Sequence, residues 1–161
     1  MRKALLLGLS LLCLLILSCD FDDAESLAQK EIRDILYDVS LDFNLGNVQG
    51  LMDHVHQDYL HKGEITLHLN NEILDRLARF QLLEIEVLYI EISGDYAVAH
   101  TRDHYQSDIE SVTFNEPEDH GYFSFFHRSK GSWLIYGDHK WVKQNWRRPK
   151  ITSVQGDIEA F

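Results

Sequence analysis

Residues 82–106 read LLEIEVLYIEISGDYAVAHTRDHYQ. β-Branched and aromatic side chains alternate with polar ones along this stretch, and Gly94-Asp95 in its middle is a turn sequence. We therefore predict an antiparallel hairpin whose two strands are residues 83–93 and 95–106.

The strand pattern continues toward the C-terminus. We expect further strands at 109–114, 120–129 and 132–142, with a turn at Lys130-Gly131 between the last two. The connections between these segments are short, so that neighbouring strands pair antiparallel.

Upstream of residue 82 the apolar residues recur with a helical period. The first predicted helix runs from Ser26, which has capping-box spacing to Gln29, to Phe43, and Gly46 ends it. Its apolar stripe consists of Ile32, Ile35, Leu36, Val39 and Phe43.

Two shorter helices follow the first one. Asn47 is expected to cap a helix that ends before Tyr59, and Asn70 or Asn71 to cap a third helix. Leu74, Leu77 and Ala78 are predicted to form the buried side of the third helix. Helices followed by an antiparallel meander indicate an α+β fold, in which N-terminal helices pack against a curved, mainly antiparallel sheet.

The N-terminus has the pattern of a lipoprotein signal. Arg2 and Lys3 precede an apolar run at 4–17, and Ile16-Leu17-Ser18-Cys19 resembles the site at which lipoprotein signal peptidase cleaves before a cysteine. The alternative, an uncleaved membrane helix, would need roughly 20 apolar residues. We therefore expect lipidation of Cys19 and a location in the bacterial cell envelope, anchored to a membrane.

This interpretation divides the chain into four segments. They are a signal peptide (1–18), a lipidated tether (19–25), one domain (26–146) and a tail (147–161). Cleavage would discard Cys13, so that the lipidated Cys19 would be the only cysteine left and no disulfide could form.

The charge balance excludes some partners. The whole chain carries 15 basic and 26 acidic residues, a net charge of −11, and loss of the signal peptide removes only Arg2 and Lys3. A strongly acidic domain is not expected to bind nucleic acid or to adsorb to anionic lipid through its charge. An exported domain also has little access to ATP or nicotinamide, and we expect no cofactor.

Several short motifs together resemble the nuclear transport factor 2-like superfamily, also called SnoaL-like or cystatin-like. They are Phe43-Asn44-Leu45-Gly46-Asn47, Leu51-Met52, His56-Gln57-Asp58-Tyr59, Gly94-Asp95-Tyr96-Ala97-Val98-Ala99 and Gly131-Ser132-Trp133-Leu134-Ile135. The resemblance implies a cone, a curved sheet wrapped around a long helix with a cavity between them. The superfamily contains isomerases, dehydratases, epoxide hydrolases and members that only bind, so the fold leaves the chemistry open.

Strand alternation divides the 95–106 segment into two faces. One face carries Val98, His100, Arg102 and His104, and the other carries Ala97, Ala99, Thr101 and Asp103. Comparison with ketosteroid isomerase turns the first set inward. A one-residue slip in the later strands would instead turn Tyr122, Phe126, Trp133, His139 and Trp141 inward.

The first assignment, extended to the later strands, implies a ligand-binding set, to which the family resemblance adds Tyr59 and His61 because members often place a cavity-mouth residue there. Its members are Tyr59, His61, His100, Arg102, His104, Phe123, Phe125, His127, Tyr136 and Asp138. Arg102 between two histidines would suit a small anionic or hydroxylated ligand, because a guanidinium can bind a carboxylate in bidentate geometry. Two other interpretations stay open: a buried Arg102–Asp138 pair, and a polar row on the exposed face.

No metal site is predicted, although the chain has nine histidines. His54 and His56 diverge if they lie on a helix, and Arg102 between His100 and His104 would repel a cation.

The preferred function is a non-catalytic domain that binds a small ligand or a protein partner. One alternative is a small hydro-lyase or isomerase that uses His100, His104, Asp138 and Tyr59. Another is a scaffold that forms a homodimer through aromatic side chains on the outer sheet face, namely Tyr122, Phe126, Trp133 and Trp141.

Overall fold

A computed structural model describes residues 20–138. Cys19, the predicted signal peptide and the predicted tail lie outside the described residues, as do His139, Trp141 and the end of the last predicted strand. Among the described residues no helix is both long enough and apolar enough to cross a bilayer.

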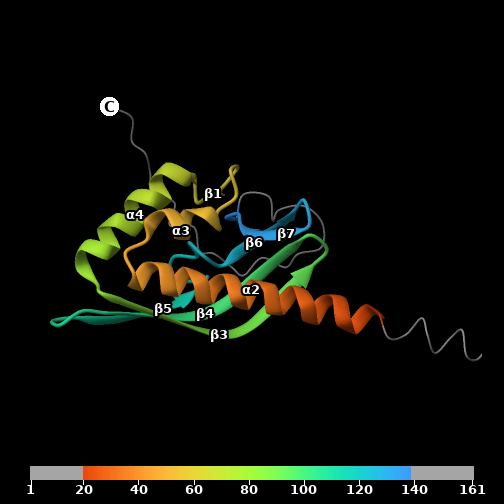
Figure 1. Ribbon diagram of the computed structural model, residues 1–161, viewed down its shortest axis with the longest axis horizontal. Helices are drawn as coiled ribbons and strands as arrows, with labels where there is room; N and C mark the ends of the chain where they lie inside the picture. Colours follow the sequence, from red (N-terminus) through yellow and green to blue (C-terminus); the bar gives the residue numbers. More distant parts are fainter. Residues whose placement is uncertain (1–19, 139–161) are drawn as a thin grey trace, which may run out of the picture.

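The helices precede the strands of the main sheet, and a short pair of strands lies between the second and third helices (Figure 1). The helices are α2 (Asp20–Asn44), α3 (Val48–Asp53) and α4 (Thr66–Arg79). The strands are β1 (Leu60–His61), β2 (Glu64–Ile65), β3 (Leu82–Ser93), β4 (Tyr96–Gln106), β5 (Ser111–Glu116), β6 (Phe125–Ser129) and β7 (Ser132–Ile135). The predicted α+β class is confirmed.

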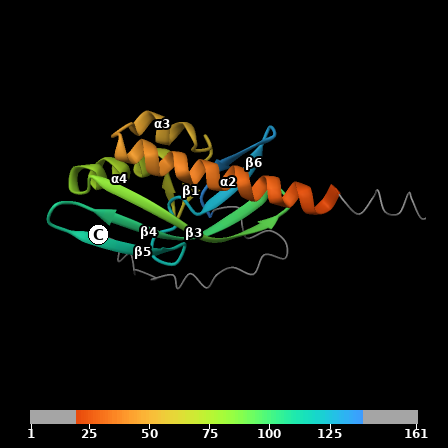
Figure 2. The same cartoon turned by 60° about the horizontal axis from the view of Figure 1, so that its bottom comes forward.

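Strand β4 organises the five-stranded antiparallel sheet. It pairs along one edge with β3, and its other edge is shared: Val98 pairs with Phe125 of β6, and Thr101 pairs with Glu116 of β5. Strand β7 continues the sheet beyond β6, while β1 and β2 form a separate two-stranded sheet. The helices gather on one side of the large sheet (Figure 2), and α4 lies toward the β5 end.

Helix α2 is packed lengthwise on the sheet, as the sequence predicted. All five residues of its predicted stripe are buried, and Ile32 and Val39 are completely inaccessible. Ala97 and Ala99 of β4 are also fully buried in this core, where their small side chains let the helix approach the sheet closely. Each large aliphatic side chain buried here contributes about 1.5–3 kcal/mol.

Two helices begin earlier than predicted. Helix α2 starts at Asp20 and not at Ser26. Helix α4 starts at Thr66 and not at Asn70 or Asn71, because the His68 ring accepts the backbone N–H of Ile65 (3.2 Å) at its start. The predicted Asn47 cap of α3 is confirmed, with its side-chain oxygen accepting the Gly50 N–H.

Candidate functional site

The predicted row on β4 faces away from the helices, which corrects the assignment made from sequence. Arg102 is exposed and donates to Glu86 (2.7 Å), so it is neither a clamp in a cavity nor a partner of Asp138. His104 contacts the Thr113 hydroxyl (2.9 Å) on the neighbouring strand. His100 stacks on Tyr89 with ring centroids 4.1 Å apart.

The reason is that alternation on β4 is ambiguous. Ala97, Val98 and Ala99 are all buried, so hydrophobicity alone does not identify the helix-facing side. Polar Thr101 and Asp103 take the inner positions because the Thr101 hydroxyl donates to the Asp103 carboxylate (2.6 Å) inside the core.

The later strands show the one-residue slip. Phe126, Trp133 and Ile135 lie in the main core, whereas Phe125 packs against Val98 in a separate cluster. Phe123 is buried in the main core, as its predicted inward position requires.

His127 and Tyr136 form a further aromatic group. Their ring centroids are 4.8 Å apart, and Tyr136 also meets His56 at 5.0 Å. They therefore do not lie beside Arg102 or His104.

The aromatic surface predicted for a homodimer is also corrected. Phe126 and Trp133 are buried in the core, and Tyr122 packs against it, because these side chains are needed to fill the space under the helices. Trp141 lies outside the described residues.

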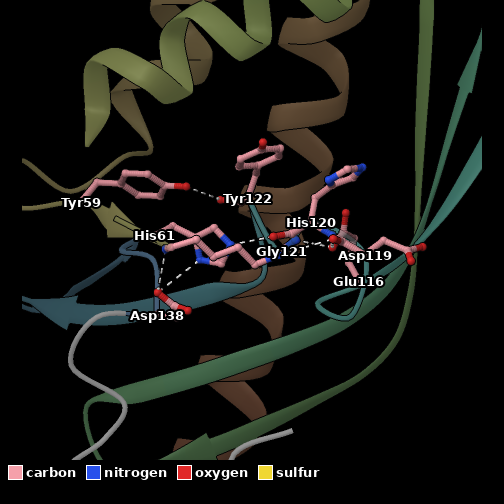
Figure 3. Close-up of polar contacts among 9 residues, drawn as sticks. Tyr59, His61, Glu116, Asp119, His120, Gly121, Tyr122 and Asp138 are labelled. Atoms are coloured by element: carbon pink, nitrogen blue, oxygen red, sulfur yellow. Dashed lines mark hydrogen bonds and ion pairs between the residues drawn. The ribbon is translucent and has the colours of Figure 1, made fainter. Parts of the chain in front are cut away.

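The structure does bring His61 and Asp138 together (Figure 3). The His61 ring is completely buried, with Nε2 2.6 Å from the His120 carbonyl and Nδ1 3.5 Å from the Asp138 carboxylate. The Lys62 N–H also donates to Asp138 (3.1 Å), and the Tyr59 hydroxyl donates to the Tyr122 carbonyl (3.4 Å). We call the contacts of His61 with Asp138 and His120 the His61 clasp.

The His61 clasp is suited to holding three segments, and not to proton transfer. Nε2 contacts the His120 carbonyl, whereas the buried Nδ1 makes no hydrogen bond with any of the described residues and lies 3.5 Å from the Asp138 carboxylate. Because the ring is completely buried, neither nitrogen is accessible to a substrate. The predicted catalytic set is also scattered, since His100 lies between Glu91 and Glu118, 3.9 Å from each, and not beside Asp138.

Asp138 should make the clasp sensitive to acid. Burial raises its pKa, but the interaction with the neighbouring His61 ring and the hydrogen bond from the Lys62 amide outweigh burial, so the pKa of Asp138 lies below its ordinary value. A lowered folded pKa stabilises the protein above the unfolded pKa, and this stability is lost as the pH falls through the folded pKa.

We therefore expect Asp138→Asn to lower the free energy of unfolding at pH 7 by more than at pH 3. Urea denaturation at both pH values measures the difference. Asp95→Asn, in the exposed β3–β4 turn, removes one carboxylate without touching the clasp and should show no such change. An equal loss at both pH values for Asp138→Asn would contradict the ion pair.

Gly137, just before Asp138, is fixed by a close backbone approach. Its φ is +82°, and an added Cβ would lie 2.2 Å from the Leu60 carbonyl oxygen. Gly131 has a similar φ of +92° but open space around the Cβ position. Alanine at either position has the same unfavourable backbone conformation, and only Gly137→Ala adds a clash.

Gly137→Ala is therefore expected to be less stable than Gly131→Ala by about 2 kcal/mol, the usual cost of overpacking. Thermal unfolding of the two variants checks this, because the matched pair cancels the cost of the positive φ. Equal losses of stability in the two variants would show that the backbone at Leu60 moves away from the added methyl group without an energetic cost.

The turn from Glu116 to Gly121 links the His61 clasp to a second polar region. The Glu116 carboxylate accepts the backbone N–H of His120 (2.9 Å) and of Gly121. Gly121 has a φ of +78°, and a Cβ there would lie 3.0 Å from the His61 ring. The turn is thus held from inside by Glu116 and from the side by His61, which fixes the position of His120.

Arg76 on α4 is the charged centre of this second region. It is only 8% exposed, and its Nε donates to Glu72 (2.7 Å) one turn earlier. The guanidinium carbon lies 4.8 Å from the Tyr105 ring centroid, 5.2 Å from that of Phe114 and 5.1 Å from that of Tyr122. Three aromatic rings and one carboxylate therefore enclose a buried cation.

Two buried acids lie near Arg76. Burial raises the pKa of Asp103 to about 7, against the Thr101 hydrogen bond and the charge of Arg76, which lower it. Burial likewise raises the pKa of Glu116, in spite of its two backbone hydrogen bonds. Arg76 thus compensates part of the negative charge that the inner sheet face would carry.

An open pocket of about 440 Å³ lies over Arg76, between α4 and β5. Its lining residues are Glu72, Asp75, Arg76, Arg79, Phe80, Phe114 and His120. We call it the α4 pocket. None of these residues belongs to the predicted ligand-binding set.

One feature of the sequence indicates this pocket and was missed in the prediction. Glu72 and Arg76 have the i,i+4 spacing of a helical ion pair, on a helix that was predicted. Its buried side was assigned to Leu74, Leu77 and Ala78. Leu74 and Ala78 are in fact exposed, Leu77 is only partly buried, and Leu69, Ile73 and Arg76 face the core.

The α4 pocket is the candidate binding site, and the His61 clasp holds the turn that places His120 on its wall. The pocket has aromatic and charged side chains around it and the imidazole of His120 at one side. Such a concave site with few polar groups can hold a small molecule.

Comparisons with known proteins identify the architecture. No protein-family model and no curated protein matches the sequence. Solved structures do match: an NTF-2 like protein of unknown function from Shewanella oneidensis has a TM-score of 0.53 at 14% identity, over 68% of this chain and 94% of that one. A function-unknown protein from Mycobacterium tuberculosis has a TM-score of 0.57 at 12% identity, over 74% of each chain.

A third structure gives the fold a second name. It is a protein of unknown function with a cystatin-like fold from Nostoc punctiforme, with a TM-score of 0.53 at 11% identity, over 69% of this chain and 87% of that one. At these identities the likeness concerns architecture and carries no activity across. The chain therefore has the nuclear transport factor 2-like, or cystatin-like, fold that the sequence motifs indicated.

Proposed function

We propose that this protein is a non-catalytic binding protein of the bacterial cell envelope, anchored by lipid at Cys19, whose domain holds a small molecule in the α4 pocket. The observation that carries the proposal is the pocket itself, with aromatic side chains and four charged groups around about 440 Å³. A volume of this size accommodates a ring-bearing molecule of low molecular weight.

A binding role is favoured over catalysis by His61 or Asp103, because neither of these buried groups lines the pocket. His61 is inaccessible to solvent, with the His120 carbonyl 2.6 Å from Nε2 and the Asp138 carboxylate 3.5 Å from Nδ1. Asp103 is also buried, at 3% exposure, and does not line the pocket. A general acid or base must reach the proton that it transfers, either directly or through one water.

The binding half of the proposal is tested by calorimetric titration of the full chain with benzamide, a neutral ring-bearing probe. We expect saturable binding, and we expect Phe114→Leu to weaken it because the substitution removes an aromatic wall of the pocket. Tyr89→Leu changes an exposed ring on the opposite sheet face and should leave the affinity unchanged. Binding that Phe114→Leu leaves intact would refute the α4 pocket as the site.

The envelope half is tested separately by mass spectrometry of the membrane fraction. We expect the mature chain to begin at Cys19 and to carry the mass of a diacylglyceryl group, and Cys19→Ala to abolish both. A Cys19→Ala variant that still carries lipid would overturn the anchor without bearing on the pocket.

A further inference from the structure

The α4 pocket contains two arginines whose charges are already neutralised. Arg76 is bound by Glu72 at 2.7 Å, and Arg79 makes a two-pronged ion pair with Glu110. An anionic ligand would have to displace one of these carboxylates to reach a guanidinium. The arginines therefore give the pocket little power to attract an anion.

The remaining charge is negative. Asp75 lines the pocket, and its carboxylate makes no ion pair or hydrogen bond with any of the residues 20–138. Glu116 is buried behind the pocket wall that carries His120, and the whole chain has a net charge of −11. Both the local and the overall field favour the approach of a cation.

The aromatic walls suit a cation as well. The guanidinium carbon of Arg79 lies 5.0 Å from the ring centroid of Phe80. The guanidinium carbon of Arg76 lies 5.2 Å from the ring centroid of Phe114. The pocket thus already stabilises positive groups against its rings, since the face of an aromatic ring attracts cations.

His120 adds an uncharged acceptor. Burial, and then the charges of Arg76 and Lys62, lower the pKa of His120, so that the ring is neutral at pH 7. One nitrogen of a neutral imidazole accepts a hydrogen bond. A donor group in the pocket would therefore find Asp75 and His120 as acceptors.

We infer that the ligand of the α4 pocket is a small organic cation, an ammonium or amidinium group carried on an apolar ring, held between Asp75 and the rings of Phe80 and Phe114. This inference rests on the proposed binding function and adds the chemical class of the ligand. It replaces the anionic ligand that Arg102 suggested in the sequence.

Three probes of one shape separate the charge from the ring: benzamidine, which is cationic at pH 7, neutral benzamide and anionic benzoate. Calorimetric titration of the full chain is expected to give the tightest binding for benzamidine and the weakest for benzoate. Asp75→Asn should weaken benzamidine about fivefold, as for loss of one exposed ion pair, and leave benzamide unchanged.

Asp95→Asn is the matched control, because it changes the net charge by the same amount at the far end of β4 and should leave all three affinities unchanged. Tightest binding of benzoate, or benzamidine binding that Asp75→Asn does not alter, would overturn the cation inference and leave the binding function standing. Failure of all three probes to bind would overturn both.

Discussion

Arg76→Met is expected to lower the free energy of unfolding by about 3 kcal/mol, the usual range when one partner of a buried ion pair is removed. The guanidinium is enclosed by the rings of Tyr105, Phe114 and Tyr122, and it faces the buried acid Asp103. Methionine fills much of the volume but leaves the carboxylates without a counter-charge. Urea denaturation at pH 7 gives the value.

Arg79→Met, one turn later on α4, is the matched control for this prediction. Arg79 pairs with Glu110, but its side chain is 61% exposed, and exposed pairs contribute less than about 1 kcal/mol. The helix, the residue type and the substitution are the same in both variants, so that burial is the main difference. Equal losses for the two variants would show that Arg76 is not the compensating charge of the inner sheet face.

Asp103→Asn is expected to change how stability depends on pH. Because the pKa of Asp103 is about 7 in the folded protein against an ordinary 3.8, the folded chain keeps this proton over a range in which the unfolded chain releases it. The free energy of unfolding therefore falls as the pH rises from about 4 to about 7 and is flat above that. From pH 5 to pH 8 this one group should cost about 3 kcal/mol.

Asparagine cannot ionise, yet its side-chain oxygen can still accept the Thr101 hydroxyl. The variant should equal the wild type at pH 5 to within about 1 kcal/mol and exceed it in stability at pH 8. Urea denaturation of both proteins at the two pH values isolates Asp103, because every other titrating group is common to them. If the free energy of unfolding changed equally with pH in the variant and the wild type, Asp103 would ionise in the folded state as easily as in water.

The elements could be predicted from the sequence because local patterns determine them. The stripe from Ile32 to Phe43 has a helical period, and the stretch at 82–106 has a strand period and a glycine turn. The structure confirms the helix and the hairpin that these patterns predicted. The short β1–β2 ribbon was not predicted, since strands of two residues leave no periodic signal.

Which face of β4 points toward the helices could not be predicted, and the predicted ligand-binding set depended on that assignment. Three consecutive buried residues, Ala97 to Ala99, conceal which face meets the helices, and a one-residue difference exchanges every inner side chain for an outer one. Arg102 and His104 are outside for this reason, and Asp103 is inside.

Part of the clasp was nevertheless predicted. Tyr59, His61 and Asp138 were all members of the predicted ligand-binding set, and the structure brings His61 and Asp138 together. Their pairing was not predicted, because it joins residues 77 positions apart in sequence through the path of the chain, which no local pattern records. The α4 pocket depends in the same way on the meeting of α4 with β5 and the turn that carries His120.

The most direct test of a ligand-binding α4 pocket is an NMR titration of the full chain with benzamidine, following the ring signals of Phe114 and His120. We predict saturable shifts of both rings, with the signals of Tyr89 and His100 on the opposite sheet face unchanged. Shifts confined to Tyr89 and His100, or unchanged signals of Phe114 and His120 at saturating probe, would contradict the account.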